Sequence, residues 1–262
     1  MSFKIIDAHM HVGPAAGRMV PDQSIEQLVH VMDKLGIEKG ISANVYDLAG
    51  KERYEEGLAM DAKAYELSGG RIFSFSGFGT LHPEEGVASI RAHKDDPRVV
   101  GIKLHPAGGR SRADDEKYRP VWEVAKEVDK PIMSHTWAVS TYNPNQTYAT
   151  ADLFEKWVRE YPEVTFVFGH CGGRYHGVKD AIAIGKKYKN AYFDITGDIF
   201  MNGFVEELVE NIGADRIVYG SDYTMIEQRP MMGAVLGANI STLDKEKILY
   251  HTANRIYFKK ED

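Results

Sequence analysis

Residues 3–11 of the chain read Phe-Lys-Ile-Ile-Asp-Ala-His-Met-His, an apolar run that closes on two histidines two positions apart. A short β-branched run of this kind is typical of a buried strand. In a dinucleotide-binding sheet a Gly-x-Gly-x-x-Gly turn follows the first strand, and none follows this one. The segment therefore favours a closed (β/α)8 barrel over an open doubly wound sheet, which stays the alternative.

Apolar segments like this one recur along the chain, and each is followed by a charged, amphipathic stretch. This alternation indicates a parallel sheet covered by crossover helices. The expected strands are residues 3–9, 40–45, 72–79, 99–105, 131–135, 164–170, 191–195 and 217–220. The expected helices are residues 24–35, 54–67, 84–94, 117–128, 151–160, 178–188, 204–211 and 244–258. Because no linker or low-complexity tract interrupts these units, they predict an α/β protein with one (β/α)8 TIM-barrel domain over residues 1–262.

The composition is that of an ordinary globular protein, with 43% hydrophobic and 27% charged residues. A length of 262 residues also suits a single barrel, which takes roughly 250. The formal net charge is −6, from 32 basic and 38 acidic residues without a long run of either sign. Such a surface produces no general electrostatic field that would attract nucleic acid or an anionic membrane. The expected partner is therefore a small molecule.

The single cysteine, Cys171, excludes an intramolecular disulfide and fits a reducing compartment. The first residues reach Lys4 and Asp7 before an apolar stretch of signal-peptide length can form. No run of about 20 apolar residues occurs, so the sequence predicts no transmembrane helix. The expected location is the cytoplasm.

Chemistry-bearing side chains gather where the predicted strands end. In a (β/α)8 barrel the active site lies at the carboxyl ends of the strands. Side chains two apart on a strand face the same side, so we expect His9 and His11 to point together into the barrel mouth. Imidazole and carboxylate groups bind zinc-type ions, and so many at strand ends predict a metal site rather than isolated core histidines. The candidates are His9, His11, His105, His135, His170 and Asp222.

Five ordered motifs and a C-terminal segment carry a resemblance to a known family. They are Asp7-Ala8-His9-Met10-His11, Gly101-Ile102-Lys103-Leu104-His105-Pro106, Ser134-His135, Phe168-Gly169-His170-Cys171-Gly172-Gly173, Gly220-Ser221-Asp222 and Thr252-Ala253-Asn254-Arg255. Together they resemble the amidohydrolase superfamily over essentially the whole chain. More narrowly, they resemble its amidohydrolase-related branch of metal-dependent hydrolases and aminocarboxymuconate-semialdehyde-type decarboxylases.

The resemblance implies a ligand set and a catalytic residue. It implies that His9, His11, His135 and Asp222 hold one divalent ion, Zn²⁺ first, with Mn²⁺ and Fe²⁺ as alternatives. His170 then stays beside the ion as a catalytic acid/base. Relatives of this family are often dimers or larger, which implies a homo-oligomer.

Lys103 has two readings under the same resemblance. In binuclear relatives, a carboxylated lysine at the end of the fourth strand bridges two metals, and Lys103 stands at that place. Alternatively, Lys103 binds substrate or pairs with a carboxylate, and His105 faces the same mouth. The branch with this Lys-x-His-Pro pattern generally works with one metal, so a mononuclear site is preferred.

Residues that would bind the substrate lie on the connections after the strands. Arginines there suit a bidentate grip on a carboxylate, which predicts an anionic substrate. The alternative is ordinary solvated loop charge. An aromatic wall is expected from Trp137. The arginines are Arg18, Arg110, Arg112, Arg174 and Arg229.

Three functions follow from this reading. The first is a metal-dependent hydrolase that cleaves an ester, lactone or amide bond of a small carboxylated molecule with metal-activated water. Asp222 would accept the proton of the water, and His170 would position the water or protonate the leaving group. The alternative is a metal-dependent, non-oxidative decarboxylase in which His170 or Asp222 delivers a proton to carbon. The third is a barrel without catalysis that serves as a binding protein.

Overall fold

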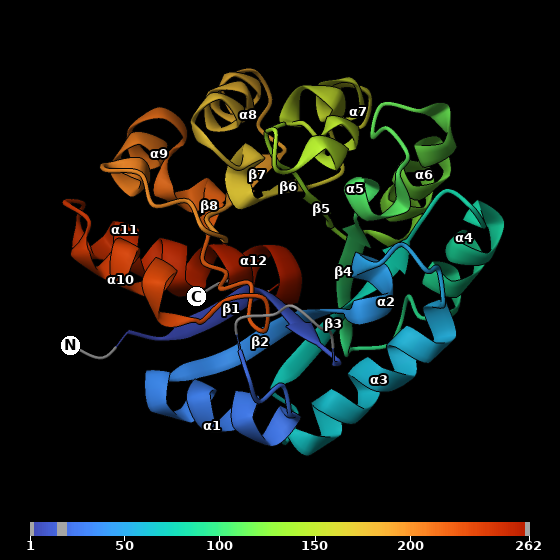
Figure 1. Cartoon of the computed structure of the whole chain (residues 1–262), viewed down its shortest axis with the longest axis horizontal. Helices are drawn as coiled ribbons and strands as arrows, with labels where there is room; N and C mark the ends of the chain where they lie inside the picture. Colours follow the sequence, from blue (N-terminus) through green and yellow to red (C-terminus); the bar gives the residue numbers. More distant parts are fainter. Residues whose placement is uncertain (1–2, 15–19, 260–262) are drawn as a thin grey trace.

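The computed structural model describes residues 3–14 and 20–259. Its centre is one sheet of eight parallel strands in the order β1 to β8, surrounded by helices (Figure 1). This arrangement confirms the predicted (β/α)8 barrel. The strands are β1 (Ile5–Val12), β2 (Ile37–Asn44), β3 (Ile72–Phe78), β4 (Val99–Leu104), β5 (Ile132–His135), β6 (Phe166–Gly169), β7 (Ala191–Asp194) and β8 (Ile217–Val218).

Backbone hydrogen bonds between β1 and the segment after β8 close the barrel. The N–H of Ala8 donates to the carbonyl oxygen of Tyr219 at 2.9 Å. The N–H groups of Ser221 and Asp222 both donate to the carbonyl oxygen of His9, at 3.2 Å and 2.8 Å. Closure therefore also places Asp222 beside His9.

The long helices lie outside the strands and join them in the expected alternation (Figure 1). They are α1 (Ile25–Leu35), α3 (Tyr54–Leu67), α4 (Pro83–Ala92), α6 (Arg119–Val128), α7 (Glu155–Glu160), α8 (Tyr175–Lys187) and α9 (Phe204–Ile212). The helix expected over 244–258 is divided into α11 (Thr242–Glu246), a π-helical turn (Lys247–His251) and α12 (Thr252–Phe258).

Three further helices lie where the sequence predicts connections. They are α2 (Val45–Leu48), α5 (Pro106–Gly109) and α10 (Arg229–Gly237). The first two are single turns, too short to show a helical period. The third contains Pro230, Gly233 and Gly237, residues that have low helix propensity. Arg229, expected in a loop, is the first residue of α10.

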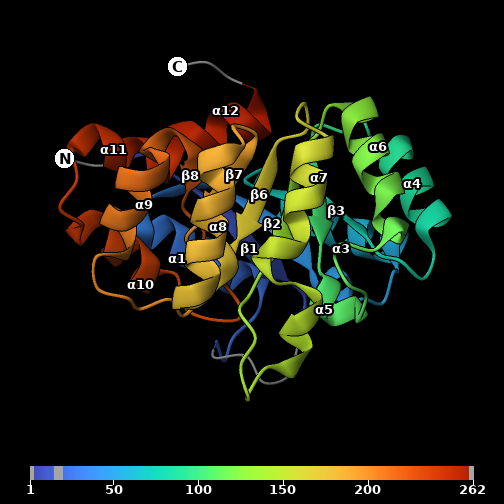
Figure 2. The same cartoon turned by 90° about the horizontal axis from the view of Figure 1, so that it is seen from above.

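The two ends of the barrel differ. At one end α12 closes the interior, where Ala253 and Tyr257 pack in one cluster with Ile6 and Phe75 of the strands. At the opposite end, α5 and the segment after β5 project beyond the barrel (Figure 2). The strand ends that carry the candidate residues therefore face away from α12.

A β-bulge in β1 turns the two histidines into the mouth. The strand continues to Val12, three residues beyond the expected end at residue 9, and its pairing with β2 shifts between Asp7 and Met10. Ahead of the shift, Ile6 packs in the barrel interior; beyond it, Met10 belongs to the cluster that includes the outer helices. Bulges re-aim side chains in this way near functional sites.

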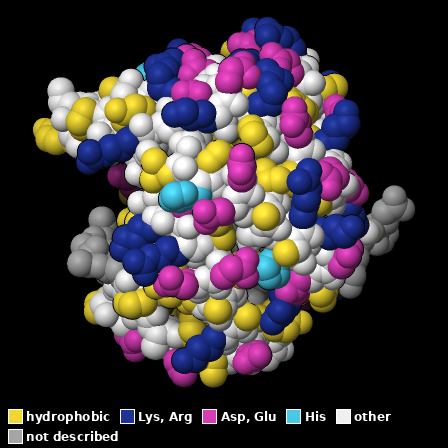
Figure 3. Space-filling model, turned by 90° about the vertical axis from the view of Figure 1, so that its right-hand side faces the viewer, with side chains coloured by type: hydrophobic (Ala, Val, Ile, Leu, Met, Phe, Trp, Pro, Cys, Tyr) yellow, Lys and Arg dark blue, Asp and Glu magenta, His cyan; other side chains and the backbone are white. Residues whose placement is uncertain are grey.

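Acidic and basic side chains alternate on the face formed by α4 and α6 (Figure 3). Arg91 of α4 pairs with Glu127 of α6 at 2.6 Å, and Arg119 pairs with Glu116 at 2.7 Å.

None of the helices in the described ranges has the length and apolar run that a membrane crossing requires.

Candidate metal centre

Five imidazole rings form a continuous row across the barrel mouth. The centroid of His9 lies 5.1 Å from that of His11 and 4.9 Å from that of His170. The row continues from His170 to His135 at 4.7 Å, and from His135 to His105 at 4.5 Å. The fold thus brings together histidines from the ends of β1, β4, β5 and β6, which the sequence placed at strand ends.

His9 is held in one tautomer by its two neighbours. Its Nδ1 contacts the carboxylate of Asp194, and its Nε2 lies 2.7 Å from the Nζ of Lys103. An ammonium group only donates, so Nε2 carries a lone pair and the ring proton lies on Nδ1. A carboxylate behind a histidine is the arrangement that orients imidazole ligands toward metals.

His11 and Asp222 form a contact that requires a positive charge, either a second ring proton on His11 or a bound cation. The Nδ1 of His11 donates to the carbonyl oxygen of Ala43 at 2.9 Å, and its Nε2 lies 2.8 Å from the Oδ1 of Asp222. Burial lowers the pKa of His11, which favours the neutral ring, with its lone pair on Nε2. Two acceptor atoms at this distance repel unless a positive charge lies beside both. The donor set therefore fits a divalent ion, because nitrogen and carboxylate lone pairs converge there.

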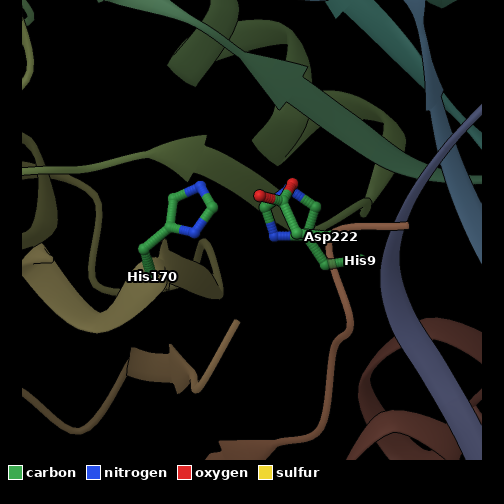
Figure 4. A group of neighbouring side chains, drawn as sticks. All are labelled: His9, His170 and Asp222. Atoms are coloured by element: carbon green, nitrogen blue, oxygen red, sulfur yellow. The ribbon is translucent and has the colours of Figure 1, made fainter. Parts of the chain in front are cut away.

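His170 completes a compact group with His9 and Asp222. One ligand atom from each of the three lies within 4.8 Å of the others, and the imidazole of His170 faces the other two side chains (Figure 4). The Nδ1 of His170 lies 3.2 Å from the carbonyl oxygen of Thr196, so Nε2 is its free nitrogen. His170, expected as an acid/base, thus lies as close to the expected ligands His9 and Asp222 as a third ligand would.

His135 lies farther along the row and has a different environment. Its Nε2 lies 2.9 Å from the Oε1 of Gln146, in the 3₁₀ turn Pro144–Tyr148 that follows β5. Its ring stacks on Trp137, with centroids 6.3 Å apart and planes inclined by 11°. If Nε2 donates to Gln146, Nδ1 is the nitrogen left for a metal. The assignment of His135 as a ligand stays a prediction.

Burial keeps the imidazoles of the mouth neutral. Desolvation lowers the pKa of His170 to about 4 and that of His105 to about 3. The ammonium group of Lys103 is also buried, which lowers its pKa to about 8, while the carboxylates of Asp194 and Asp222 act in the opposite direction. Neutral imidazole is the form that binds metals.

Two acidic residues of the site escaped the sequence analysis. Asp194 ends β7 and contacts His9, so the strand-end rule that singled out the histidines would also have found it. Asp47, in α2, lies close to Lys103, whose pKa it helps to raise. Its carboxylate occupies the space that a Cβ at Gly77 of β3 would need. No spacing in the sequence links Asp47 to Gly77.

The expected substrate residues divide into two groups. Trp137 is 7% exposed, and its ring centroid lies 5.2 Å from that of His170, so it borders the metal donors. The described arginines are exposed at the surface, three on loops and Arg229 at the start of α10. Three pair with a nearby carboxylate: Arg112 with Asp114 at 2.9 Å, Arg174 with Asp198 at 3.1 Å and Arg229 with Glu227 at 2.7 Å. Arg110 follows α5 with a left-handed backbone, φ 50°, and Arg18 lies outside the described residues.

Comparison with known families gives one match over nearly the whole chain. The family model described as amidohydrolase matches residues 6–259. None of the curated proteins compared with the chain matches it.

Solved structures share the barrel over nearly its whole length. A dihydroxybenzoic acid decarboxylase from Polaromonas sp. JS666, described with bound manganese and the inhibitor 2-nitroresorcinol, is 16% identical, with a TM-score of 0.75 over 99% of this chain and 98% of that chain. A 2,6-dihydroxybenzoate decarboxylase from Rhizobium is 16% identical, with a TM-score of 0.70 over 98% and 99%. A 5-carboxyvanillate decarboxylase from Sphingomonas paucimobilis is 14% identical, with a TM-score of 0.76 over 98% and 99%. Structural similarity at sequence identities this low establishes a shared fold.

Proposed function

Because the chain belongs to the amidohydrolase family, we propose that it is a metal-dependent carboxy-lyase that removes CO₂ from a hydroxylated aromatic carboxylic acid. The observation that carries this proposal is the buried ammonium group of Lys103, 2.7 Å from His9 and beside the metal donors. A metal ion that takes the Nε2 lone pair of His9 would displace the ammonium group of Lys103 from that atom, and the charge of Lys103 would then be available to a carboxylate of the substrate. The decarboxylases that share the fold also act on aromatic acids, which supports the same substrate class.

The metal would be held by His9, His11, His135 and Asp222, with His170 next to them. When bound, a divalent cation, Zn²⁺, Mn²⁺ or Fe²⁺, supplies Lewis-acid stabilisation to substrate oxygens. The description of one relative with manganese favours testing Mn²⁺ beside Zn²⁺.

The protein groups bind the acid and supply one proton. Lys103 attracts the carboxylate, and Trp137 offers an apolar face to the ring. The bond between the ring carbon and the carboxylate carbon breaks, CO₂ leaves, and the electron pair stays on the ring carbon. That carbon takes a proton from the protonated form of His170 or Asp222. Because the pKa of each group is lowered, that group first takes up the proton from water.

The second candidate is hydrolysis of an ester, lactone or amide of a small carboxylated molecule. It is favoured by the match to the family model described as amidohydrolase. In this reaction Asp222 accepts a proton from water, and His170 gives a proton to the leaving group. Lys103 would bind the carboxylate of the substrate, away from the scissile bond.

One assay separates the two reactions. Metal-loaded protein is given 2,6-dihydroxybenzoate or 5-carboxyvanillate, and separately a panel of lactones and carboxylic esters, with CO₂ release and acid production recorded in parallel. We expect CO₂ from an aromatic acid, with the rate abolished in Asp222→Asn and weakened substrate binding in Lys103→Met. Acid production from the ester panel without CO₂ from either aromatic acid would refute the carboxy-lyase and select the hydrolase.

A further inference from the structure

His105 is fixed in a single tautomer by the chain that follows it. It stands between β4 and α5, and its Nδ1 accepts a hydrogen bond from the backbone N–H of Gly108 at 2.9 Å. The same N–H lies 3.1 Å from the carbonyl oxygen of His105. A backbone N–H can only donate, so Nδ1 must carry a lone pair. An imidazole with this lone pair is neutral, and its proton lies on Nε2.

Three of the other four histidines of the mouth have the opposite arrangement. The Nδ1 atoms of His9, His11 and His170 each face an oxygen acceptor, so these rings present Nε2 lone pairs. His105 presents an N–H group instead. The row of imidazoles therefore contains two chemically different kinds, and the difference comes from backbone geometry rather than from residue type.

The N–H of His105 is open to a ligand. The residue is half-buried, and no acceptor for Nε2 is present among residues 3–14 and 20–259. Its ring centroid lies 4.5 Å from that of His135, which ties it to the row. Lys103 lies two residues earlier, close enough for its charge to act on the imidazole of His105. The donor thus stands next to the ammonium group that would attract a carboxylate.

We propose that His105 binds an oxygen of the substrate, a carboxylate or phenolate oxygen, through its Nε2–H and takes no part in metal ligation. To bind a metal through Nε2, the ring would have to move its proton to Nδ1, where it would meet the N–H of Gly108. The structure therefore favours substrate over a second metal as the partner of His105. The substrate class rests on the proposed function, whereas the tautomer does not.

Two substitutions separate the two nitrogens. Asparagine at position 105 places an acceptor near Nδ1 and keeps the bond from Gly108, but it has no group near Nε2. Glutamine reaches the Nε2 position with an amide N–H but loses the acceptor. His105→Asn should therefore keep its Tm and metal content while binding of 2,6-dihydroxybenzoate weakens by ~10- to 100-fold, the range for a hydrogen bond to a charged group. His105→Gln should recover part of the binding and lose thermal stability.

The matched control is His82→Asn, an exposed histidine just ahead of α4, beyond the end of β3. It should leave binding, metal content and stability at wild-type values. If His105→Asn binds the probe as tightly as the wild type does, the inference is wrong. Loss of metal from His105→Asn, but not from His82→Asn, would also overturn it, because it would make His105 a ligand.

Nitrogen NMR tests the tautomer without any turnover. In Zn²⁺-loaded protein with ¹⁵N-labelled histidine, the resonances lost in His105→Asn should show a protonated Nε2 and an unprotonated Nδ1. Addition of 2,6-dihydroxybenzoate should shift the Nε2–H signal. A protonated Nδ1, or an Nε2–H signal that does not respond to the probe, overturns the inference. A shift without CO₂ release would refute the proposed carboxy-lyase and leave the role of His105 intact.

Discussion

Replacing Asp194 with asparagine should reverse the proton arrangement on His9. In the wild type, the carboxylate of Asp194 accepts the Nδ1 proton of His9, which leaves Nε2 with its lone pair. The other oxygen of Asp194 accepts from the N–H of Thr196 at 2.5 Å and from its hydroxyl group. In Asp194→Asn, the amide oxygen keeps the bonds from Thr196, so the amide NH₂ faces His9. His9 must then accept at Nδ1 and carry its proton on Nε2.

The expected loss is large because Nε2 is the atom through which His9 would bind the metal, in place of the ammonium group of Lys103. Loss of a partner that orients a ligating histidine costs metal affinity typically ~10- to 100-fold. That range corresponds to about 1.4–2.8 kcal/mol of binding free energy. Both residues are buried, so solvent cannot replace the carboxylate.

The assay is competition for Zn²⁺ between the protein and a chelator of known affinity. Thr196→Val is the matched control, because it removes a hydroxyl bond to Asp194 and leaves the contact with His9 in place. We expect a much smaller change in that variant. If Asp194→Asn binds Zn²⁺ as tightly as the wild type, His9 is not oriented by Asp194 and the proposed ligand geometry is wrong.

The remaining predictions concern the acid/base residue, the loops and the dependence of stability on pH. His11→Ala should lose metal and activity together, whereas His170→Ala should keep most of its metal and lose ~10²- to 10⁴-fold in turnover; equal metal loss in both would make His170 a ligand. Burial raises the pKa of Asp47 to about 7, so the folded state holds its proton more tightly than the unfolded state, and unfolding free energy should fall as the pH rises from about 4 to about 7. Asp47→Asn should flatten this slope in chemical denaturation, and an unchanged slope would assign the effect to other groups. The substrate role of the arginines is tested by single Arg→Met variants at Arg110, Arg112, Arg174 and Arg229. At least one variant should lose ~10- to 100-fold in kcat/KM for an anionic substrate. Wild-type kinetics in all four would show that these arginines do not bind it.

The barrel could be predicted from sequence because each strand and its following helix have different periodicities. The ends of the elements were less predictable, since they depend on partners far away in the chain. The strand expected over 217–220 keeps only Ile217–Val218, because the N–H of Tyr219 donates to the carbonyl oxygen of Ile248, outside the sheet. The bulge in β1 leaves no mark in the apolar pattern, yet it sets the direction of His9.

The candidate site was predictable where chemistry coincides with a strand end. His9, His135 and His170 were found in this way, and the fold brings them together. The tautomers of the histidines could not be predicted from the sequence. They depend on acceptors such as the carbonyl oxygen of Ala43 and on donors such as the N–H of Gly108.

The substrate role of the arginines was predicted from residue type and loop position, and it stays a prediction. Two of them lie two residues from the carboxylate with which they pair, as in Arg112 with Asp114 and Arg229 with Glu227. That local spacing was visible in the sequence. It gives these guanidinium groups a nearby carboxylate, which competes with a substrate carboxylate for them.

The metal content of the protein tests the central claim most directly. Protein purified without chelator, and analysed by elemental mass spectrometry, should contain about one divalent ion per chain, because the imidazoles and the carboxylate of the mouth would form one nearly complete shell. The ion should leave on dialysis against a chelator, and activity should return with Zn²⁺ or Mn²⁺. About two ions per chain would move Lys103 into the metal site. Full activity in metal-free protein would contradict the account.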